Sequence, residues 1–115
     1  MEIKILITGG TGFVGANLVD ALLGHDLVLM QRHPSELGHA NIIRSLDSNF
    51  NYVQDMAEVD VVVHSAALVP ETNGGRKPSR KEYLEVNAHS TETLARCASM
   101  AGVKHFIFIS SIKVN

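Results

Sequence analysis

IKILITGGTGFVG, residues 3–15, is the stretch that decides the fold of this 115-residue chain. Residues 3–8 alternate in the manner of a β-strand, and a cluster of glycines follows them directly. Beyond the glycines, apolar side chains recur at helical spacing, at Val14, Leu18, Val19, Leu22 and Leu23. The stretch therefore predicts a strand over 3–8, a tight turn, and a helix over 12–23.

The glycine turn before this helix indicates a site for the pyrophosphate of a dinucleotide. A helix N-terminus has unpaired N–H groups and a partial positive charge, and a phosphate group satisfies both. We assign Gly9 to the turn, Gly12 to the closest approach of the ligand, and Gly15 to close packing of helix on strand. The N–H groups of Phe13 and Val14 are expected to face the pyrophosphate. The alternative is a glycine-rich turn without a ligand. A P-loop is excluded because no Gly-Lys-Ser/Thr follows.

The rest of the chain alternates between strand and helix patterns. Further strands are expected at 26–31, 41–45, 60–64 and 104–110. Asp47 or Ser48 can cap a short helix that ends near Met56, and a long helix is expected over 79–101, before Gly102. These elements predict an α/β fold, a Rossmann-like doubly wound parallel sheet with strand order 3-2-1-4-5 and right-handed crossovers.

The segments that carry candidate ligand-binding residues each lie at the carboxyl end of a predicted strand. They are residues 8–15, 31–32, 46–47, 64–68 and 110–111. In a parallel sheet the carboxyl ends of the strands lie at one edge, and ligands bind there, at the switch between strands one and four. The sequence therefore predicts a single ligand site built by these segments.

Composition limits the other possibilities. A formal charge of -2 and a hydrophobic content of 45% indicate one globular domain that does not bind nucleic acid. The six histidines show no metal-ligand spacing, so no metal site is expected. Cys97 is the only cysteine and falls in an apolar helical pattern, which indicates a core position and a reducing compartment. With no signal peptide and no membrane-spanning stretch in the sequence, we expect a cytoplasmic protein.

Four ordered segments resemble the extended short-chain dehydrogenase/reductase family, which comprises NAD(P)-dependent sugar-nucleotide epimerases, dehydratases and reductases. They are the glycine turn, Val-Val-His-Ser-Ala-Ala at 62–67, Glu-Val-Asn at 85–87, and Phe-Ile-Phe-Ile-Ser-Ser at 106–111. The following Ile-Lys-Val-Asn is similar to a subgroup of nucleotide-sugar 4-epimerases and 4-ketoreductases of bacterial polysaccharide pathways. The resemblance covers the whole chain and implies an NAD(P)-binding Rossmann domain over residues 1–115.

One departure from the family pattern concerns the Tyr-x-x-x-Lys pair that lies downstream of the catalytic Ser. Tyr52 and Tyr83 are followed four residues later by Met56 and Asn87, so neither supplies this pair. We therefore expect an inactive N-terminal fragment of a longer enzyme, without the remaining strands and the substrate domain. Its apolar edge strand at 104–110 is expected to promote self-association into a homo-oligomer.

The resemblance also implies roles for individual residues. Ser111 takes the position of the catalytic Ser, whose hydroxyl hydrogen-bonds the reacting oxygen, although it could instead cap the strand end. Ala66, Ala67 and Leu68 lie where the family contacts the ribose and pyrophosphate of the cofactor. Asn87 is similar to the Asn that braces strand four and the cofactor loop, with an exposed helical Asn as the alternative.

Cofactor choice depends on the end of the second strand, where the family places an acidic residue when NAD is preferred. Gln31 stands there and Arg32 follows, which favours NADP(H) over NAD(H). A solvated Arg32 stacked over adenine would be compatible with either cofactor. Asp47 matches the family Asp that accepts from the adenine amino group, unless it caps the next helix, and Asp55 is a poorer candidate. His64 is expected to be a buried structural histidine.

Three functions are consistent with these residues. The first is the cofactor-binding part of an epimerase or 4-ketoreductase that moves a hydride between C4 of a nucleotide-sugar substrate and nicotinamide. The second is a non-catalytic NAD(P)-binding sensor. The third is a family reductase of non-sugar ketones or a steroid dehydrogenase.

A cluster of basic residues lies beside the predicted cofactor edge and consists of Arg76, Lys77, Arg80 and Lys81. These side chains could bind the diphosphate of the substrate, but a solvated loop and helix start fits them better.

Overall fold

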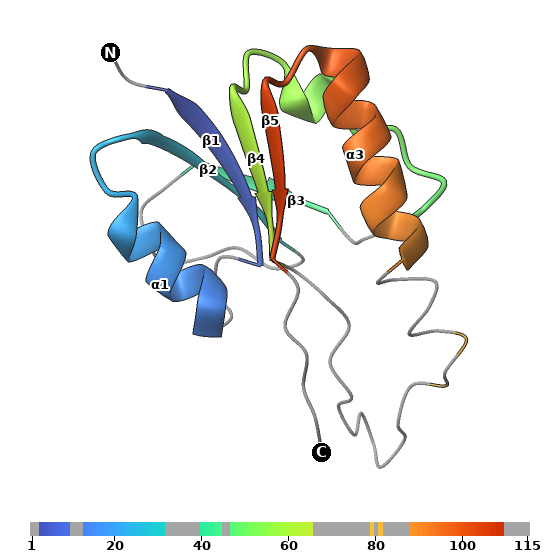
Figure 1. Cartoon of the computed structure of the whole chain (residues 1–115), viewed down its shortest axis with the longest axis horizontal. Coiled ribbons are helices and arrows are strands. Elements are labelled where there is room, and N and C mark those ends of the chain that lie inside the picture. Colours follow the sequence, from blue (N-terminus) through green and yellow to red (C-terminus); the bar gives the residue numbers. More distant parts are fainter. Residues whose placement is uncertain are drawn as a thin grey trace.

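Five parallel strands form the centre of the molecule (Figure 1). The computed structural model describes residues 3–9, 13–31, 40–44, 47–65, 79, 81 and 88–109. The strands are β1 (Lys4–Thr8), β2 (Asp26–Gln31), β3 (Ala40–Ile43), β4 (Val61–His64) and β5 (His105–Phe108). Their order is β3-β2-β1-β4-β5 and every neighbouring pair is parallel, which confirms the predicted sheet.

The central strand carries apolar side chains to both faces of the sheet, because successive residues of a strand point in opposite directions. Leu6 belongs to one buried cluster, whereas Ile5 and Ile7 belong to another. Figure 1 shows helix α1 (Phe13–Ala21) on one side of the sheet and helix α3 (Ser90–Ala101) on the other. The sheet is therefore covered on both faces.

The face under α3 holds the larger cluster. Leu94, Cys97 and Ala98 of α3 pack there with the sheet and with the buried side chains of Tyr52 and Met56. The burial of Cys97 confirms its predicted core position. On the opposite face, α1 contributes Val19, with partly buried Leu18 and Leu22 beside it: the buried residues of this cluster are Ile5, Ile7, Val19, Leu27, Leu29 and Val63.

The prediction of a short helix from Asp47 to about Met56 is wrong. The segment instead forms turns that end in a single 3₁₀ turn, η1 (Gln54–Met56). Asp47 Oδ1 accepts the N–H of Asn49 at 2.8 Å, and Asn51 Oδ1 accepts the N–H of Val53 at 3.0 Å. Such side-chain bonds to the backbone two residues onward offer the chain an alternative to the helical ladder. Asp47 therefore caps a turn and not a helix.

Of the predicted helix over 79–101, the structure describes residues 79, 81 and 88–101, and Ser90–Ala101 form α3 after a π-helical turn at residues 88 and 89. The helix ends as predicted at Gly102, which has a φ of 82° and donates its N–H to the carbonyl oxygens of Ala98 and Ser99. This left-handed cap favours glycine. Residues 80 and 82–87 of the predicted helix lie outside the described ranges.

Candidate functional site

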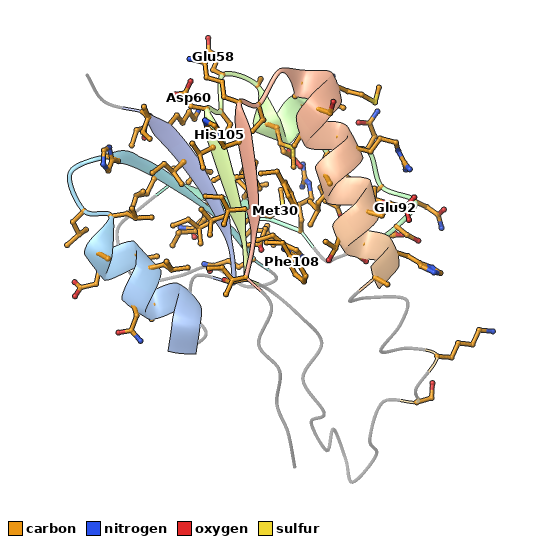
Figure 2. All side chains as sticks on the ribbon, in the orientation of Figure 1. Met30, Glu58, Asp60, Glu92, His105 and Phe108 are labelled. Atoms are coloured by element: carbon orange, nitrogen blue, oxygen red, sulfur yellow. The ribbon has the colours of Figure 1, made fainter. Side chains whose placement is uncertain are left out.

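The carboxyl ends of the five strands meet at one edge of the sheet (Figure 1). Thr8, the last residue of β1, lies in register with His64 of β4, and His64 lies in register with Phe108 of β5. Figure 2 shows Phe108 toward this end of the sheet, whereas Asp60 and His105 lie at the opposite end. Strands β2 and β3 extend the sheet from one side of β1, whereas β4 and β5 extend it from the other side. The carboxyl end of β1, at Thr8, is therefore the switch point at which open α/β sheets bind ligands.

The glycine turn lies at this edge. Gly9 directly follows β1 and has a φ of 72°, a left-handed conformation that favours glycine. The first turn of α1 contains the backbone of Phe13, Val14 and Gly15, and Figure 1 shows that this helix begins at the edge where the strands end. Gly12 lies outside the described residues. Strand, left-handed glycine and helix start therefore occur in the predicted order, and pyrophosphate contact by these residues stays a prediction.

The buried hydroxyl of Thr8 links the ends of β1 and β4. Its Oγ1 lies 2.6 Å from Nδ1 of His64 and accepts the N–H of Ser65 at 3.0 Å. The hydroxyl of Ser65 in turn donates to the carbonyl oxygen of Thr8 at 2.5 Å. These contacts hold two neighbouring strands together immediately before the glycine turn.

His64 is fully buried and extends the same network to α3. Its Nε2 lies 3.0 Å from Oγ1 of Thr91, and its ring stacks on Phe108 with centroids 5.4 Å apart. Burial lowers the pKa of His64 to about 4, so the imidazole is neutral at neutral pH. A neutral imidazole has one donor and one acceptor nitrogen, which suits a bridge between the hydroxyls of Thr8 and Thr91. The predicted burial of His64 is confirmed.

Gln31 closes β2 at the same edge and is 8% exposed. Its Nε2 donates to Oδ1 of Asn41 on β3 at 2.8 Å. Within the described ranges, Oε1 of Gln31 is buried and has no donor. A buried acceptor without a donor is costly unless a ligand or water supplies one.

Asp47 lies just beyond β3, with an exposed side chain. Its N–H donates to Oη of Tyr52 at 2.9 Å, so the buried phenol holds its backbone. Asp55, the poorer candidate for the adenine contact, forms a two-pronged ion pair with Arg44 through Nε at 2.9 Å and Nη2 at 3.0 Å. The Asp55 carboxylate is therefore engaged in bracing the segment that carries Asp47.

The other predicted site residues lie outside the described parts of the chain: Arg32, Ala66, Ala67, Leu68, Asn87 and Ser111. The structure adds Tyr52, Ser65 and Thr91, whose contacts the sequence analysis missed. Thr91 had one usable signal, because it stands four residues after Asn87 and so on the same face of the predicted helix. Tyr52 had none beyond being an aromatic residue in a segment rich in polar side chains.

Two further observations concern metals and membranes. Within residues 3–9, 13–31, 40–44, 47–65, 79, 81 and 88–109, no three His, Cys, Asp or Glu side chains group so that they could hold a metal ion. No helix in that same part of the chain is both long enough and apolar enough to cross a membrane.

The family model of the NAD dependent epimerase/dehydratase family matches residues 5–114. The chain belongs to this family. Membership also confirms the resemblance to extended short-chain dehydrogenases/reductases, a group of NAD-binding oxidoreductases and epimerases with a Rossmann-like sheet.

Two curated relatives of this chain have different functions. A UDP-glucose 4-epimerase of Vibrio cholerae is 38% identical over 120 residues, which cover 100% of this chain and 37% of the epimerase. A 3-beta-hydroxysteroid dehydrogenase of Mycolicibacterium neoaurum is 32% identical over 96% of this chain and 32% of the dehydrogenase. The chain therefore spans about a third of the length of these relatives.

Solved structures give the same picture for the fold. A short-chain dehydrogenase/reductase superfamily protein from Agrobacterium tumefaciens, with bound NAD, aligns with a TM-score of 0.78 at 32% identity, over 94% of this chain and 32% of that protein. MoeE5 in complex with UDP-glucose and NAD aligns with a TM-score of 0.75 at 32% identity, over 94% of this chain and 36% of MoeE5.

Proposed function

We propose that this chain is the dinucleotide-binding part of an NAD(P)-dependent nucleotide-sugar epimerase or 4-ketoreductase. The observation that carries the proposal is the switch point, where left-handed Gly9 follows β1 and α1 begins at the same edge. Gln31 adds a buried acceptor at this edge. These features fit the adenosine diphosphate half of a dinucleotide, and the 38% identity to a UDP-glucose 4-epimerase supports the nucleotide-sugar substrate.

In the proposed enzyme, hydride transfer to or from C4 of the sugar would be the chemistry that the nicotinamide cofactor contributes when bound. This chain binds and orients the adenosine diphosphate through the glycine turn, Asp47 and the Ala66–Leu68 segment. Ser111 hydrogen-bonds the reacting oxygen, while proton transfer needs a Tyr-x-x-x-Lys pair that is not in the 115 residues. We therefore expect the chain alone to bind a dinucleotide without turning over substrate.

Steroid or other ketone substrates form the second candidate, because 3-beta-hydroxysteroid dehydrogenases match at 32% and 35% identity. The test extends the chain by its downstream coding sequence and assays UDP-sugars, steroids and simple ketones with both nicotinamide cofactors. Epimerisation or reduction of a UDP-sugar supports the proposal, whereas activity on steroids alone transfers it to the second candidate. A stop codon directly after Asn115, together with dinucleotide binding, would instead support a sensor module.

For the cofactor we propose a preference for NADP(H), since Gln31 lacks the negative charge that repels a 2′-phosphate. Gln31→Asp is expected to weaken NADPH binding about tenfold relative to NADH, because a carboxylate then faces the phosphate. The measurement is a fluorescence titration of each reduced cofactor. Gln31→Asn is the control, since it shortens the side chain without adding charge. An unchanged NADPH/NADH ratio in Gln31→Asp would contradict the placement of the 2′-phosphate beside residue 31.

We also propose that the chain self-associates through β5. Within the described residues this strand pairs only with β4, and Ile107 is 47% exposed. An apolar, unpaired edge strand offers backbone groups to a second chain, and lysine at an edge opposes such pairing. Sedimentation should show association that grows with concentration and that Ile107→Lys reduces. Met100→Lys adds the same charge on α3 at an exposed position and should leave association unchanged. A monomer at all concentrations would refute the proposal.

A further inference from the structure

Tyr52 is the largest fully buried side chain in the described part of the chain. Its hydroxyl contacts both backbone polar groups of Asp47. Oη accepts the Asp47 N–H at 2.9 Å and lies 3.3 Å from the Asp47 carbonyl oxygen, to which it can donate. The phenol therefore fixes the backbone of Asp47 rather than filling space alone.

The ring that carries this hydroxyl is itself firmly anchored. It lies in the core cluster with Leu94 and Cys97 of α3, and the ring of Phe50 packs against it with centroids 4.8 Å apart. The N–H of Tyr52 donates to Sγ of Cys97 at 3.4 Å. Burial raises the pKa of Tyr52, which keeps the phenol protonated and able to donate. Asp47 is thus tied to the rigid centre of the molecule through one side chain.

The carboxylate of Asp47 is exposed, and the turn uses its Oδ1. Oδ1 accepts the Asn49 N–H at 2.8 Å. Tyr52 holds the backbone of Asp47, and the Asn49 N–H holds Oδ1. These two contacts together fix the direction in which the carboxylate points. A carboxylate with a fixed direction is a selective acceptor, because it binds an amino group and repels a carbonyl oxygen at the same place.

We propose that Tyr52 is a positioning residue that aims the Asp47 carboxylate at the amino group of adenine and so makes the site reject hypoxanthine. This inference rests on the proposed function, in which Asp47 accepts from adenine. It goes beyond that function by assigning base selectivity to a buried residue that does not touch the ligand.

The experiment measures the affinity of the 115-residue chain for ADP and IDP, which differ only in the amino or carbonyl group at C6 of the base. Chemical-shift titration by NMR reports both affinities and shows that each variant is folded. The wild-type chain is expected to favour ADP about tenfold, or about 1.4 kcal/mol, because the carboxylate accepts from the amino group of ADP and meets a carbonyl oxygen in IDP. Tyr52→Phe is expected to reduce this preference to about threefold or less, and Asp47→Ala to abolish it.

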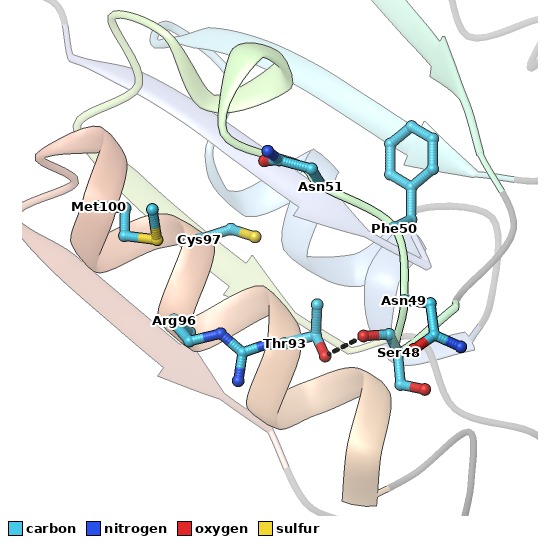
Figure 3. A pocket seen from close by; sticks show the side chains of 8 residues that line it. All are labelled: Ser48, Asn49, Phe50, Asn51, Thr93, Arg96, Cys97 and Met100. Atoms are coloured by element: carbon cyan, nitrogen blue, oxygen red, sulfur yellow. Dashed lines mark hydrogen bonds between the residues drawn. The ribbon is translucent and has the colours of Figure 1, made fainter.

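Thr93→Val is the matched control. In the wild type, the hydroxyl of Thr93 donates to the carbonyl oxygen of Ser48 at 2.7 Å (Figure 3). Thr93 therefore ties the same loop to the core, but through Ser48, the residue after Asp47. This variant should keep the ADP/IDP preference of the wild type. In the Asp47→Ala background, Tyr52→Phe should have no further effect on the preference, which a purely structural role would not explain.

The outcomes separate the two proposals. If the wild-type chain binds neither ADP nor IDP, the proposed function fails, and the inference with it. If the wild type favours ADP and Tyr52→Phe keeps that preference, or if Thr93→Val loses it equally, the inference about Tyr52 is overturned while the function stands. Sucrose is added to keep Tyr52→Phe folded. A second measurement needs no variant: fast hydrogen exchange of the Asp47 N–H in the wild type would also overturn the inference.

Discussion

As the pH falls from 6.5 to about 4, this chain is expected to lose about 3 kcal/mol of its free energy of unfolding through His64. Burial lowers the pKa of His64 from 6.5 to about 4 in the native state. In this window the unfolded chain therefore binds a proton that the folded chain does not, so stability falls as pH falls. Above the pKa of His64 in the unfolded chain, the free energy of unfolding has its full value. Below the pKa of His64 in the folded chain, no further stability is lost through this residue.

Urea unfolding at steps of pH measures this effect. His64→Asn removes the titrating group but keeps a polar side chain, so it should be less stable at pH 7 and show a flatter pH dependence between 6.5 and 4. His105→Asn, at an exposed position on β5, controls for the removal of one histidine. If His64→Asn and the wild type had parallel pH profiles, His64 would not be held neutral in the folded chain.

Thr8→Val is expected to destabilise the chain by about 3 kcal/mol although it preserves the shape of the side chain. The hydroxyl of Thr8 is the partner of His64 Nδ1 at 2.6 Å and of the Ser65 N–H at 3.0 Å. Its removal takes this partner from the buried Nδ1 of His64, and the Ser65 N–H keeps only the longer bond to the Thr8 carbonyl oxygen at 3.3 Å. A buried polar group that loses its partner costs about 1–3 kcal/mol. Chemical denaturation at pH 7 gives the difference directly.

Thr8→Ser is the matched comparison, because it keeps the hydroxyl and loses one methyl group. It should cost only about 1 kcal/mol. Equal losses in the Val and Ser variants would show that packing, rather than the hydroxyl network, is what Thr8 contributes. The network matters for function because it joins β1 and β4 directly before the proposed pyrophosphate turn.

Much of the fold is predictable from local patterns. The strand alternation before the glycines, the apolar run at β4 and the glycine at 102 each determine a nearby conformation, and the structure confirms the sheet order that follows from them. The predicted helix after Asp47 failed for an equally local reason. Asp47 and Asn51 bond the backbone two residues onward, and these turns compete with helix formation.

The candidate site likewise contains features that the sequence predicts and contacts that it does not predict. Gly9 was predictable because a left-handed turn needs glycine, and its φ of 72° agrees. The acceptor left on Gln31 was not, because it depends on Asn41 of the neighbouring strand taking up the amide N–H. The role of Tyr52 was equally hidden, since an aromatic residue in a polar segment does not reveal whether its ring is buried or which group its hydroxyl meets.

The sequence by itself determined the α/β class, the strand order and the edge at which a ligand would bind, because these follow from periodicity and from the chirality of crossovers. Only the tertiary structure decided which polar groups meet there. Thr8 and His64 are 56 residues apart, and Thr93 and Ser48 are 45 apart. Their contacts arise because the chain returns to one sheet edge, and packing of α3 against that sheet sets distances that no local pattern encodes.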